Sequence, residues 1–165
     1  MDRPILNIAD VKLRPWGHGD RYQAQIGAIA SKIGARKLGY SLTVLPPGKC
    51  AFPFHDHRAN EEMFYIVEGE GEVRFGTARH PIRAGDVIAC PAGGPETAHQ
   101  LINTSKATEL KYLGVSTLVS PEIAEYPDTG KFQAIAELPP SPDGKPQLLR
   151  LINRTNANLD YWADE

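Results

Sequence analysis

The amino-acid sequence predicts a single all-β domain of the sandwich or barrel type. Many short segments favour extended structure, and clusters of Gly and Pro separate them at regular intervals. The chain has 165 residues, which is enough for one compact domain with a buried core and too few for two ordinary ones. We therefore expect one domain over residues 1–165.

Nine segments are expected to form strands, because each favours extended structure and most end near a turn. They are residues 22–30, 38–45, 50–57, 62–70, 71–76, 86–91, 99–105, 110–118 and 130–138. The turn sequences PPGK, EGEG and RAGD place Gly or Pro where the chain must reverse. Regular spacing of this kind indicates two packed sheets or a barrel.

The two ends of the chain depart from this pattern. Residues 1–20 show no clear periodicity and are expected to lie on the surface. Residues 137–147, ELPPSPDGKPQ, are rich in proline and small polar residues, which indicates an exposed loop. In the segment that follows, Tyr161 and Trp162 are expected to anchor the tail on the body of the domain or on a neighbouring subunit.

Composition limits the partners of the protein. Hydrophobic residues make up 41% of the chain and charged residues 23%, as in soluble globular proteins. The formal net charge of -2 gives no basic excess, so we expect no nucleic-acid partner. The N-terminus lacks a secretory leader pattern, and no run of about 18 uncharged apolar residues is present. We therefore expect a cytoplasmic protein with no membrane partner.

The two cysteines, Cys50 and Cys90, are too few for a disulfide framework and do not form a close CxxC pair. Each lies near the end of an expected strand, where a free thiol usually behaves as a small buried hydrophobe. We therefore assign them no metal or redox role.

Residues 52–71, FPFHDHRANEEMFYIVEGEG, gather groups that can bind a metal. Side chains alternate faces along a strand, so His55 and His57 point to the same side. The next strand begins at Glu61 and Glu62, and both of its faces are apolar, so alternation does not choose between the two glutamates. A third imidazole, His99, follows a loop with two glycines and a proline at the start of another strand.

This set of donors suits a first-row transition metal. Three imidazoles and one carboxylate leave coordination positions open, and they suit Zn, Fe, Mn, Ni or Co better than Mg or Ca. We expect one divalent ion of this kind, held by the three histidines and one of the two glutamates. The remaining histidines, His18 and His80, lie outside the cluster and are assigned no site role.

The spacing of these residues resembles that of the cupin superfamily of small jelly-roll barrels. The first cupin motif is matched by Gly48, His55, His57, Glu62 and Gly69. The second motif is matched by Gly85, Pro91, Gly93, His99 and Asn103. Two gaps are longer than in the family pattern, by one residue after Gly48 and by three residues after Gly93.

The resemblance implies a double-stranded β-helix, that is, a jelly-roll barrel with N- and C-terminal extensions and with its two motifs over residues 48–103. It also implies that Glu62 is the carboxylate ligand, because six residues separate it from Gly69 as in the family pattern. The metal ligands that the resemblance implies are His55, His57, Glu62 and His99.

Three further segments, GGPETAHQLINTS, LKYLGVST and EYPDTGK, resemble a bacterial subgroup of single-domain cupins, some of them named sugar-phosphate isomerases. This likeness implies a metal-dependent isomerase or epimerase that acts on a small oxygenated substrate. Such a reaction needs a proton acceptor. The candidates near the expected ligands are Glu61 and Tyr65, and we expect Glu61, which is adjacent to Glu62, to take this role. Two other classes stay open: an iron-dependent dioxygenase-type oxidoreductase and a non-catalytic module that binds a small molecule.

Self-association is expected as well. Antiparallel sheets in a small barrel leave an outer face and strand edges, and the long N-terminal stretch and aromatic tail could cover those of a second copy. We therefore expect a homodimer that binds a small-molecule ligand or substrate.

Overall fold

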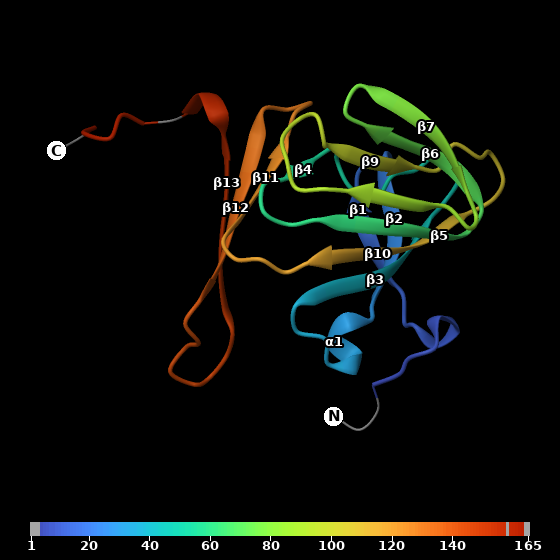
Figure 1. Ribbon diagram of the computed structural model, residues 1–165, viewed down its shortest axis with the longest axis horizontal. Helices are drawn as coiled ribbons and strands as arrows, with labels where there is room; N and C mark the ends of the chain where they lie inside the picture. Colours follow the sequence, from blue (N-terminus) through green and yellow to red (C-terminus); the bar gives the residue numbers. More distant parts are fainter. Residues whose placement is uncertain (1–3, 158, 164–165) are drawn as a thin grey trace.

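Strands and tight turns make up almost all of the regular structure in the computed structural model, which describes residues 4–157 and 159–163 (Figure 1). The strands are β1 (Arg14–His18), β2 (Tyr22–Ala28), β3 (Leu38–Leu45), β4 (Asp56–His57), β5 (Glu62–Glu68), β6 (Glu70–Phe75), β7 (Ala78–Arg83), β8 (Val87–Cys90), β9 (His99–Ile102), β10 (Leu110–Thr117), β11 (Glu122–Tyr126), β12 (Lys131–Leu138) and β13 (Gln147–Arg154). The short helices are η1 (Ile8–Asp10), α1 (Ala30–Ile33) and η2 (Thr155–Ala157). The prediction of an all-β fold is confirmed.

Three sheets build the molecule. A six-stranded sheet has the order β1-β2-β3-β10-β5-β8, and a three-stranded sheet has the order β7-β6-β9. Figure 1 shows these two sheets as the facing layers of a barrel. A four-stranded sheet, β13-β12-β11-β4, joins the barrel through β4 and extends to one side.

The core lies between the two barrel layers and follows from strand alternation. Along β5, Phe64 and Ile66 are buried while Tyr65 between them is exposed. Their side chains join a cluster that includes Leu45, Val73, Leu101, Leu110 and Tyr112. Since Glu62 has the same parity as Phe64 and Ile66, strand geometry turns its carboxylate toward the barrel interior.

The two cysteines belong to this interior. Both thiols are free and buried, which confirms the expectation that they act as small hydrophobes. Burial, together with the nearby charge of Glu62, raises the pKa of Cys90 to about 12. Its thiol therefore stays protonated at neutral pH.

The turn between β5 and β6 depends on Gly69. Its φ of 86° lies in the left-handed region, and a Cβ at this position would lie 2.2 Å from the carbonyl oxygen of Glu109. Gly85 has a similar φ of 95° but open space around it. Gly69→Ala thus combines backbone strain with a backbone clash, whereas Gly85→Ala has the strain alone.

We expect Gly69→Ala to lower the free energy of unfolding by about 3 kcal/mol or more. Gly85→Ala, the matched control, should lower it by only about 1–2 kcal/mol. Urea denaturation followed by circular dichroism measures both. Equal losses in the two variants would show that the contact with Glu109 has no effect on stability.

Several strand boundaries differ from the sequence-based expectation. Residues 50–57 do not form one strand, because Pro53 cannot donate a ladder hydrogen bond. Only Asp56–His57 is a strand there, and Cys50 makes isolated bridges to Tyr22 and Ile102. Strands β1, β7, β11 and β13 were not expected.

The ends of the chain need two corrections. Residues 14–18, for which no strand was predicted, form β1 and pair with β2, and all five are exposed, as expected of residues on the surface. Tyr161 and Trp162 pack on each other, with ring centroids 4.8 Å apart, but they are 85% and 72% exposed. The idea that they anchor the tail on the body of the same chain is therefore wrong. The loop expected over 137–147 is confirmed in its centre, where residues 139–146 connect β12 to β13.

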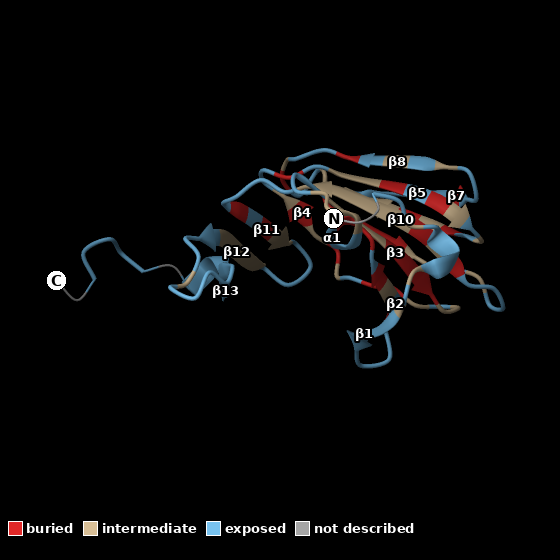
Figure 2. Cartoon of the chain, turned by 90° about the horizontal axis from the view of Figure 1, so that it is seen from below, coloured by how far each residue is buried: buried red, intermediate tan, exposed pale blue. Residues whose placement is uncertain are grey.

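The hairpin of β12 and β13 projects from the barrel, and all of β13 is exposed (Figure 2). Its apolar side chains are Leu148, Leu149, Leu151 and Ile152, with exposed fractions of 41–61%. A two-stranded hairpin is marginal on its own in water, and an exposed apolar strand edge is a site for pairing with another chain. The expected homodimer stays a prediction, and β13 is the surface that we expect it to use.

We expect light scattering to show a dimer at micromolar concentration. The double variant L151K/I152K should be a monomer, because two charges on β13 disfavour pairing with a second copy. V87K places a charge on β8, an edge strand of the six-stranded sheet, and should leave the dimer intact. A monomeric wild-type protein would contradict this prediction.

None of the helices in the described ranges has the length and apolar character needed to span a bilayer. The cytoplasmic location stays a prediction.

Candidate metal centre

A pair of backbone hydrogen bonds sets two of the predicted ligands side by side. The amide of His55 donates to the carbonyl of His99 at 3.2 Å, and the amide of His99 donates to the carbonyl of His55 at 2.8 Å. The two ring centroids are 4.8 Å apart. Residues 44 positions apart in the sequence are thus fixed next to each other by main-chain pairing.

Strand pairing also places the other two predicted ligands. His57 ends β4 and pairs with Ala124 of β11. Glu62 begins β5 between Ser116 of β10 and Cys90 of β8. Rigid neighbours on both sides hold the Glu62 backbone, so its carboxylate has a fixed place at the mouth of the barrel.

All three imidazoles point one nitrogen at a single carboxylate oxygen. The distances from Nε2 to Oε2 of Glu62 are 3.7 Å for His55, 3.4 Å for His57 and 2.9 Å for His99. His55, Glu62 and His99 form a group whose donor atoms lie within 4.8 Å of one another, as a metal site requires. His57 stands somewhat farther out, with its ring centroid 6.2 Å from that of His99.

The opposite ring nitrogens determine which tautomer is present. Nδ1 of His55 lies 2.9 Å from the carbonyl oxygen of Pro53, and Nδ1 of His99 lies 3.2 Å from that of Thr97. A carbonyl only accepts, so each Nδ1 carries the hydrogen and donates it. In the neutral rings, both Nε2 atoms therefore present a lone pair to the centre.

These residues fit a divalent cation. The Nε2 lone pairs and the Glu62 carboxylate oxygen face one another across the centre, and all of them are hydrogen-bond acceptors. Acceptors that face one another without a donor repel, and a cation bound between them removes this repulsion. Both ring nitrogens of His57 are buried and have no hydrogen-bond partner among residues 4–157 and 159–163. Such an orphaned imidazole is accounted for when one of its nitrogens binds a metal.

Charge and burial act in opposite directions on the pKa values here. Burial by itself raises the pKa of Glu62, but its interactions with the three imidazoles outweigh burial and hold the pKa well below its ordinary value. Burial lowers the pKa of His55, despite the Glu62 carboxylate nearby. Glu62 is thus ionised and His55 neutral near pH 7, the forms in which both groups ligate metals.

Glu122 is a functional residue that the sequence did not reveal. Its buried carboxylate accepts hydrogen bonds from the amides of Arg58, Ala59 and Asn60 at 2.7–3.2 Å and from the side chain of Asn60. Its Oε2 also lies 3.9 Å from Nδ1 of His57. Glu122 therefore orders the loop between β4 and β5 and faces the side of the His57 ring away from Glu62.

Two cavities meet at the centre. The first, of about 170 Å³, is mainly apolar and is lined by Phe52, Phe64, Gln100, Leu101 and Tyr112 together with all four predicted ligands. The second, of about 280 Å³, is lined by two of the ligands, His57 and Glu62, and by Asn60, Ser116, Thr117, Leu118, Val119, Ser120, Glu122, Ile135, Glu137 and Leu148. The second cavity brings hydroxyl groups to the centre.

The remaining predicted positions lie elsewhere. Glu61 is exposed and lines neither cavity, because it has the opposite parity to Glu62. Its assignment as the proton acceptor stays a prediction, and its position does not support it. His18 at the end of β1 and His80 on β7 are both exposed and stand apart from the centre.

The comparison with protein families identifies the barrel. Residues 41–116 match the family described as "Cupin domain". Residues 41–116 therefore resemble a cupin domain. The match covers β3 to β10 and includes all four residues of the metal centre. The all-β barrel fold is therefore confirmed, and the resemblance to cupins that the sequence motifs carry is confirmed over these residues.

Several known proteins are similar to this chain. A curated relative named "Oxalate-binding protein" from Thermotoga maritima is 36% identical over 75 residues, which is 46% of this chain and 58% of the relative. The chain thus matches little more than half of that relative's length.

Two solved structures share the fold over most of their length. The first is described as a sugar phosphate isomerase of the cupin superfamily from Silicibacter pomeroyi. It has a TM-score of 0.74, is 23% identical, and the match covers 93% of this chain and 94% of that one. The second, from Acidithiobacillus ferrooxidans, is described provisionally as a sugar phosphate isomerase. Its TM-score is 0.71 and its identity 21%, with 89% of this chain and 92% of that chain covered.

Proposed function

We propose that this protein is a metal-dependent isomerase or epimerase that acts on a small hydroxylated carbonyl compound, such as a sugar or sugar phosphate. One observation carries the proposal: the larger of the two cavities at the centre has both metal-ligand candidates and hydroxyl side chains in its wall. His57 and Glu62 form one part of this wall, and Ser116, Thr117 and Ser120 form another. A substrate rich in hydroxyl groups finds hydrogen-bond partners there.

The centre supplies the electrophile of the reaction. When held by the three imidazoles and Glu62, a first-row divalent ion polarises a carbonyl or hydroxyl oxygen and makes the adjacent C–H bond more acidic. In the smaller cavity of the centre, Phe64, Leu101 and Tyr112 make the surroundings of the four candidate ligands apolar. Electrostatic interactions are stronger in such a setting than in water.

The proton acceptor is the open question in this reaction. Both Glu61, the candidate from the sequence, and Glu137 are exposed, but Glu61 lines neither cavity, whereas Glu137 lines the same cavity as His57 and Glu62. Glu122 also lines it, but several donors already occupy its carboxylate. We therefore assign the role of proton acceptor to Glu137.

The proposed reaction balances without an oxidant or reductant. The Glu137 carboxylate takes a proton from the carbon beside the carbonyl group. In an isomerisation, it returns the proton to the neighbouring carbon. In an epimerisation, a water molecule on the opposite face gives a proton to the same carbon, and Glu137 gives its own proton to solvent. In an isomerisation, a second proton moves between the two oxygen atoms of the substrate. The neighbour from Silicibacter pomeroyi supports this reading through its shared fold and its name.

A second candidate function rests on the smaller cavity. Its volume of about 170 Å³ is below the range of about 300–1,000 Å³ that is usual for ligand pockets. It suits a ligand of few heavy atoms, and the Thermotoga maritima relative is named for binding oxalate. A non-catalytic module that holds a two-carbon dicarboxylate at the metal is thus the alternative.

Solvent exchange tests the proposal without knowledge of the product. Aldoses, ketoses and their phosphates are incubated with the metal-loaded protein in deuterated water, and proton NMR follows loss of the carbon-bound proton. We expect Glu137→Gln to slow exchange by about 10²-fold, as for loss of a general base. Glu61→Gln is the matched control and should exchange at the wild-type rate.

Two outcomes contradict parts of this account. A slow Glu61→Gln with a normal Glu137→Gln would return the acceptor role to Glu61. If no compound exchanges with any first-row metal, while oxalate binds saturably and only to the metal-loaded protein, the binding module replaces the enzyme.

A further inference from the structure

A third cavity lies outside the metal centre, between the N-terminal segment, the hairpin of β1 and β2, and helix α1. Its volume is about 770 Å³, within the range that is usual for small-molecule sites. Its lining consists of Leu6, Asp10, Lys12, Arg14, Pro15, Trp16, Ile26, Ala28, Ser31, Lys32 and Phe52. We call it the N-terminal groove.

The N-terminal groove is basic. Lys12, Arg14 and Lys32 line it against a single carboxylate, Asp10, although the whole chain has a net charge of -2. These three basic side chains form no ion pair and no side-chain hydrogen bond within the described part of the chain. By contrast, six Lys and Arg side chains elsewhere in residues 4–157 and 159–163 pair with a carboxylate. The groove thus offers three uncommitted cations to a ligand.

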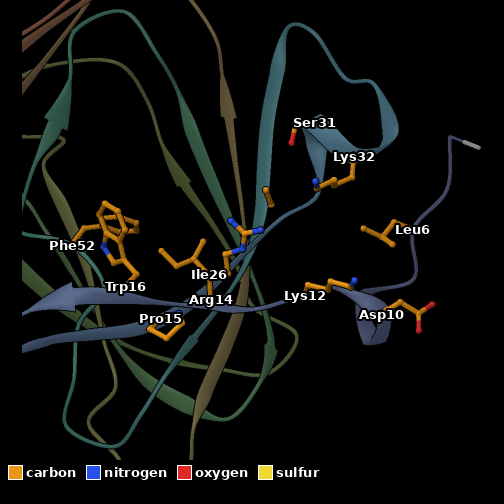
Figure 3. A pocket seen from close by; sticks show the side chains of 11 residues that line it. Leu6, Asp10, Lys12, Arg14, Pro15, Trp16, Ile26, Ser31, Lys32 and Phe52 are labelled. Atoms are coloured by element: carbon orange, nitrogen blue, oxygen red, sulfur yellow. The ribbon is translucent and has the colours of Figure 1, made fainter. Parts of the chain in front are cut away.

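The opposite end of the groove is aromatic. Figure 3 shows Trp16 and Phe52 together at one end, with Arg14 farther along the groove and Lys12 and Lys32 beyond it. The indole of Trp16 donates to the carbonyl of Ala51 at 3.2 Å, and its ring lies 5.8 Å from that of Phe52. The hydrogen bond holds the indole of Trp16 beside Phe52, and the planes of the two rings are tilted by 49° to each other.

The aromatic end of the groove lies beside the metal centre. Phe52 lines both the N-terminal groove and the smaller cavity of the centre. Its ring centroid is 6.4 Å from that of His55. A molecule with its anionic group among the cations and its body along Trp16 and Phe52 extends toward His55.

We propose that the N-terminal groove binds the phosphate group of a sugar phosphate whose reactive end lies at the metal centre. Arg14 forms two parallel hydrogen bonds to phosphate oxygens, Lys12 adds charge from the same segment, and Lys32 adds charge from helix α1 across the groove. Trp16 and Phe52 pack against the sugar carbons. Only the last part, that the bound molecule is the substrate of the centre, rests on the proposed function.

Tryptophan fluorescence measures this binding directly. The chain has two tryptophans, so Trp162→Phe leaves Trp16, which is 54% exposed, as the reporter. The probes are glucose 6-phosphate and ribose 5-phosphate, with glucose, ribose and inorganic phosphate as references. We expect saturable binding of the two sugar phosphates that weakens with salt, and no saturable binding of the parent sugars.

Two matched triple variants identify the cations responsible. K12Q/R14Q/K32Q should weaken binding of the sugar phosphates by about tenfold or more, as for loss of hydrogen bonds to a charged group. R36Q/K37Q/K106Q removes the same charge at exposed positions outside the groove and should bind as the wild type does. Circular dichroism confirms that both variants fold.

Separate variants test the phosphate site in the groove and the metal centre, so each of the two proposals can be contradicted without the other. His99→Ala impairs the centre but should keep the affinity for sugar phosphate within about twofold, because the phosphate contacts lie elsewhere. Equal weakening by the two triple variants, or no saturable binding of either sugar phosphate, would overturn the proposal. So would a dimer that dissociates in K12Q/R14Q/K32Q, because the groove would then be an interface between copies.

Discussion

His99→Ala and His57→Ala are each expected to abolish tight binding of a divalent metal. Nε2 of each ring lies within 3.4 Å of the same Glu62 oxygen, and each variant removes one of only four protein donors. The loss in affinity should exceed about 100-fold, since even residues that only orient a ligand contribute about 10–100-fold. Competition with a chromophoric chelator, together with elemental analysis after dialysis, measures this change.

The control for these variants is His80→Ala. His80 is exposed on β7 and has no contact with the centre, so its replacement should leave affinity unchanged. If both His57→Ala and His99→Ala retain a full equivalent of tightly bound metal, the four residues are not the ligand set.

The same measurement against pH adds a test with a definite sign. Imidazoles must be neutral to ligate, so metal affinity should fall as the pH drops through about 6.5. Burial would lower the pKa of His57, but the carboxylates of Glu62, Glu122 and Asp56 outweigh burial and raise it. Protons therefore compete for His57 at a higher pH than for an ordinary histidine.

Glu122→Ala is expected to have the second largest effect. Its carboxylate accepts three amides of residues 58–60 and the Asn60 side chain, and without it these buried donors lose their partner. We expect the free energy of unfolding to fall by about 2–4 kcal/mol. Metal affinity should fall by about 10–100-fold, because the loop between His57 and Glu62 is no longer held.

Glu125→Ala on the same strand is the control for Glu122→Ala. Glu125 forms a partly exposed ion pair with Arg58 and does not contact the ligands. Its loss should cost no more than about 1 kcal/mol and leave metal affinity unchanged. Chemical denaturation and metal titration of the two variants measure these effects. Equal losses of stability and of metal affinity in both variants would show that Glu122 has no specific role at the metal centre.

The histidines of the centre could be predicted from the sequence because their signal is local. Alternation along a strand places His55 and His57 on one face, and the motif spacing adds Glu62 and His99. The observed distances, all at or below 3.7 Å to one Glu62 oxygen, agree with this local reasoning. The strands of the core were predictable for the same reason, since one of their faces is buried.

Glu122 could not be predicted because its role comes from contacts that are distant in sequence. Its partners lie 62–64 positions away, and no local pattern separates it from a surface glutamate. Strands β1 and β13 were missed for a related reason. Every residue in both is exposed, so neither shows the alternation that marks a strand with one buried face.

Glu61 shows that a residue next to a predicted ligand in the sequence need not lie in the same cavity as that ligand. It is next to a ligand in the sequence, but neighbouring residues in a strand point to opposite faces. Glu137, 75 positions beyond Glu62 in the chain, lines the cavity that Glu61 does not. Proximity in the fold, which depends here on the hairpin of β12 and β13, decides which carboxylate can reach a substrate.

The central claim is that one divalent ion binds among His55, His57, Glu62 and His99. Anomalous scattering from a crystal of the protein as purified, recorded above and below the absorption edges from Mn to Zn, tests it most directly. We predict a single anomalous peak within bonding distance of the three Nε2 atoms and the Glu62 carboxylate, and the edge at which it appears identifies the metal. A peak at other residues, or no peak at any edge after the crystal is soaked in these metals, would contradict the account.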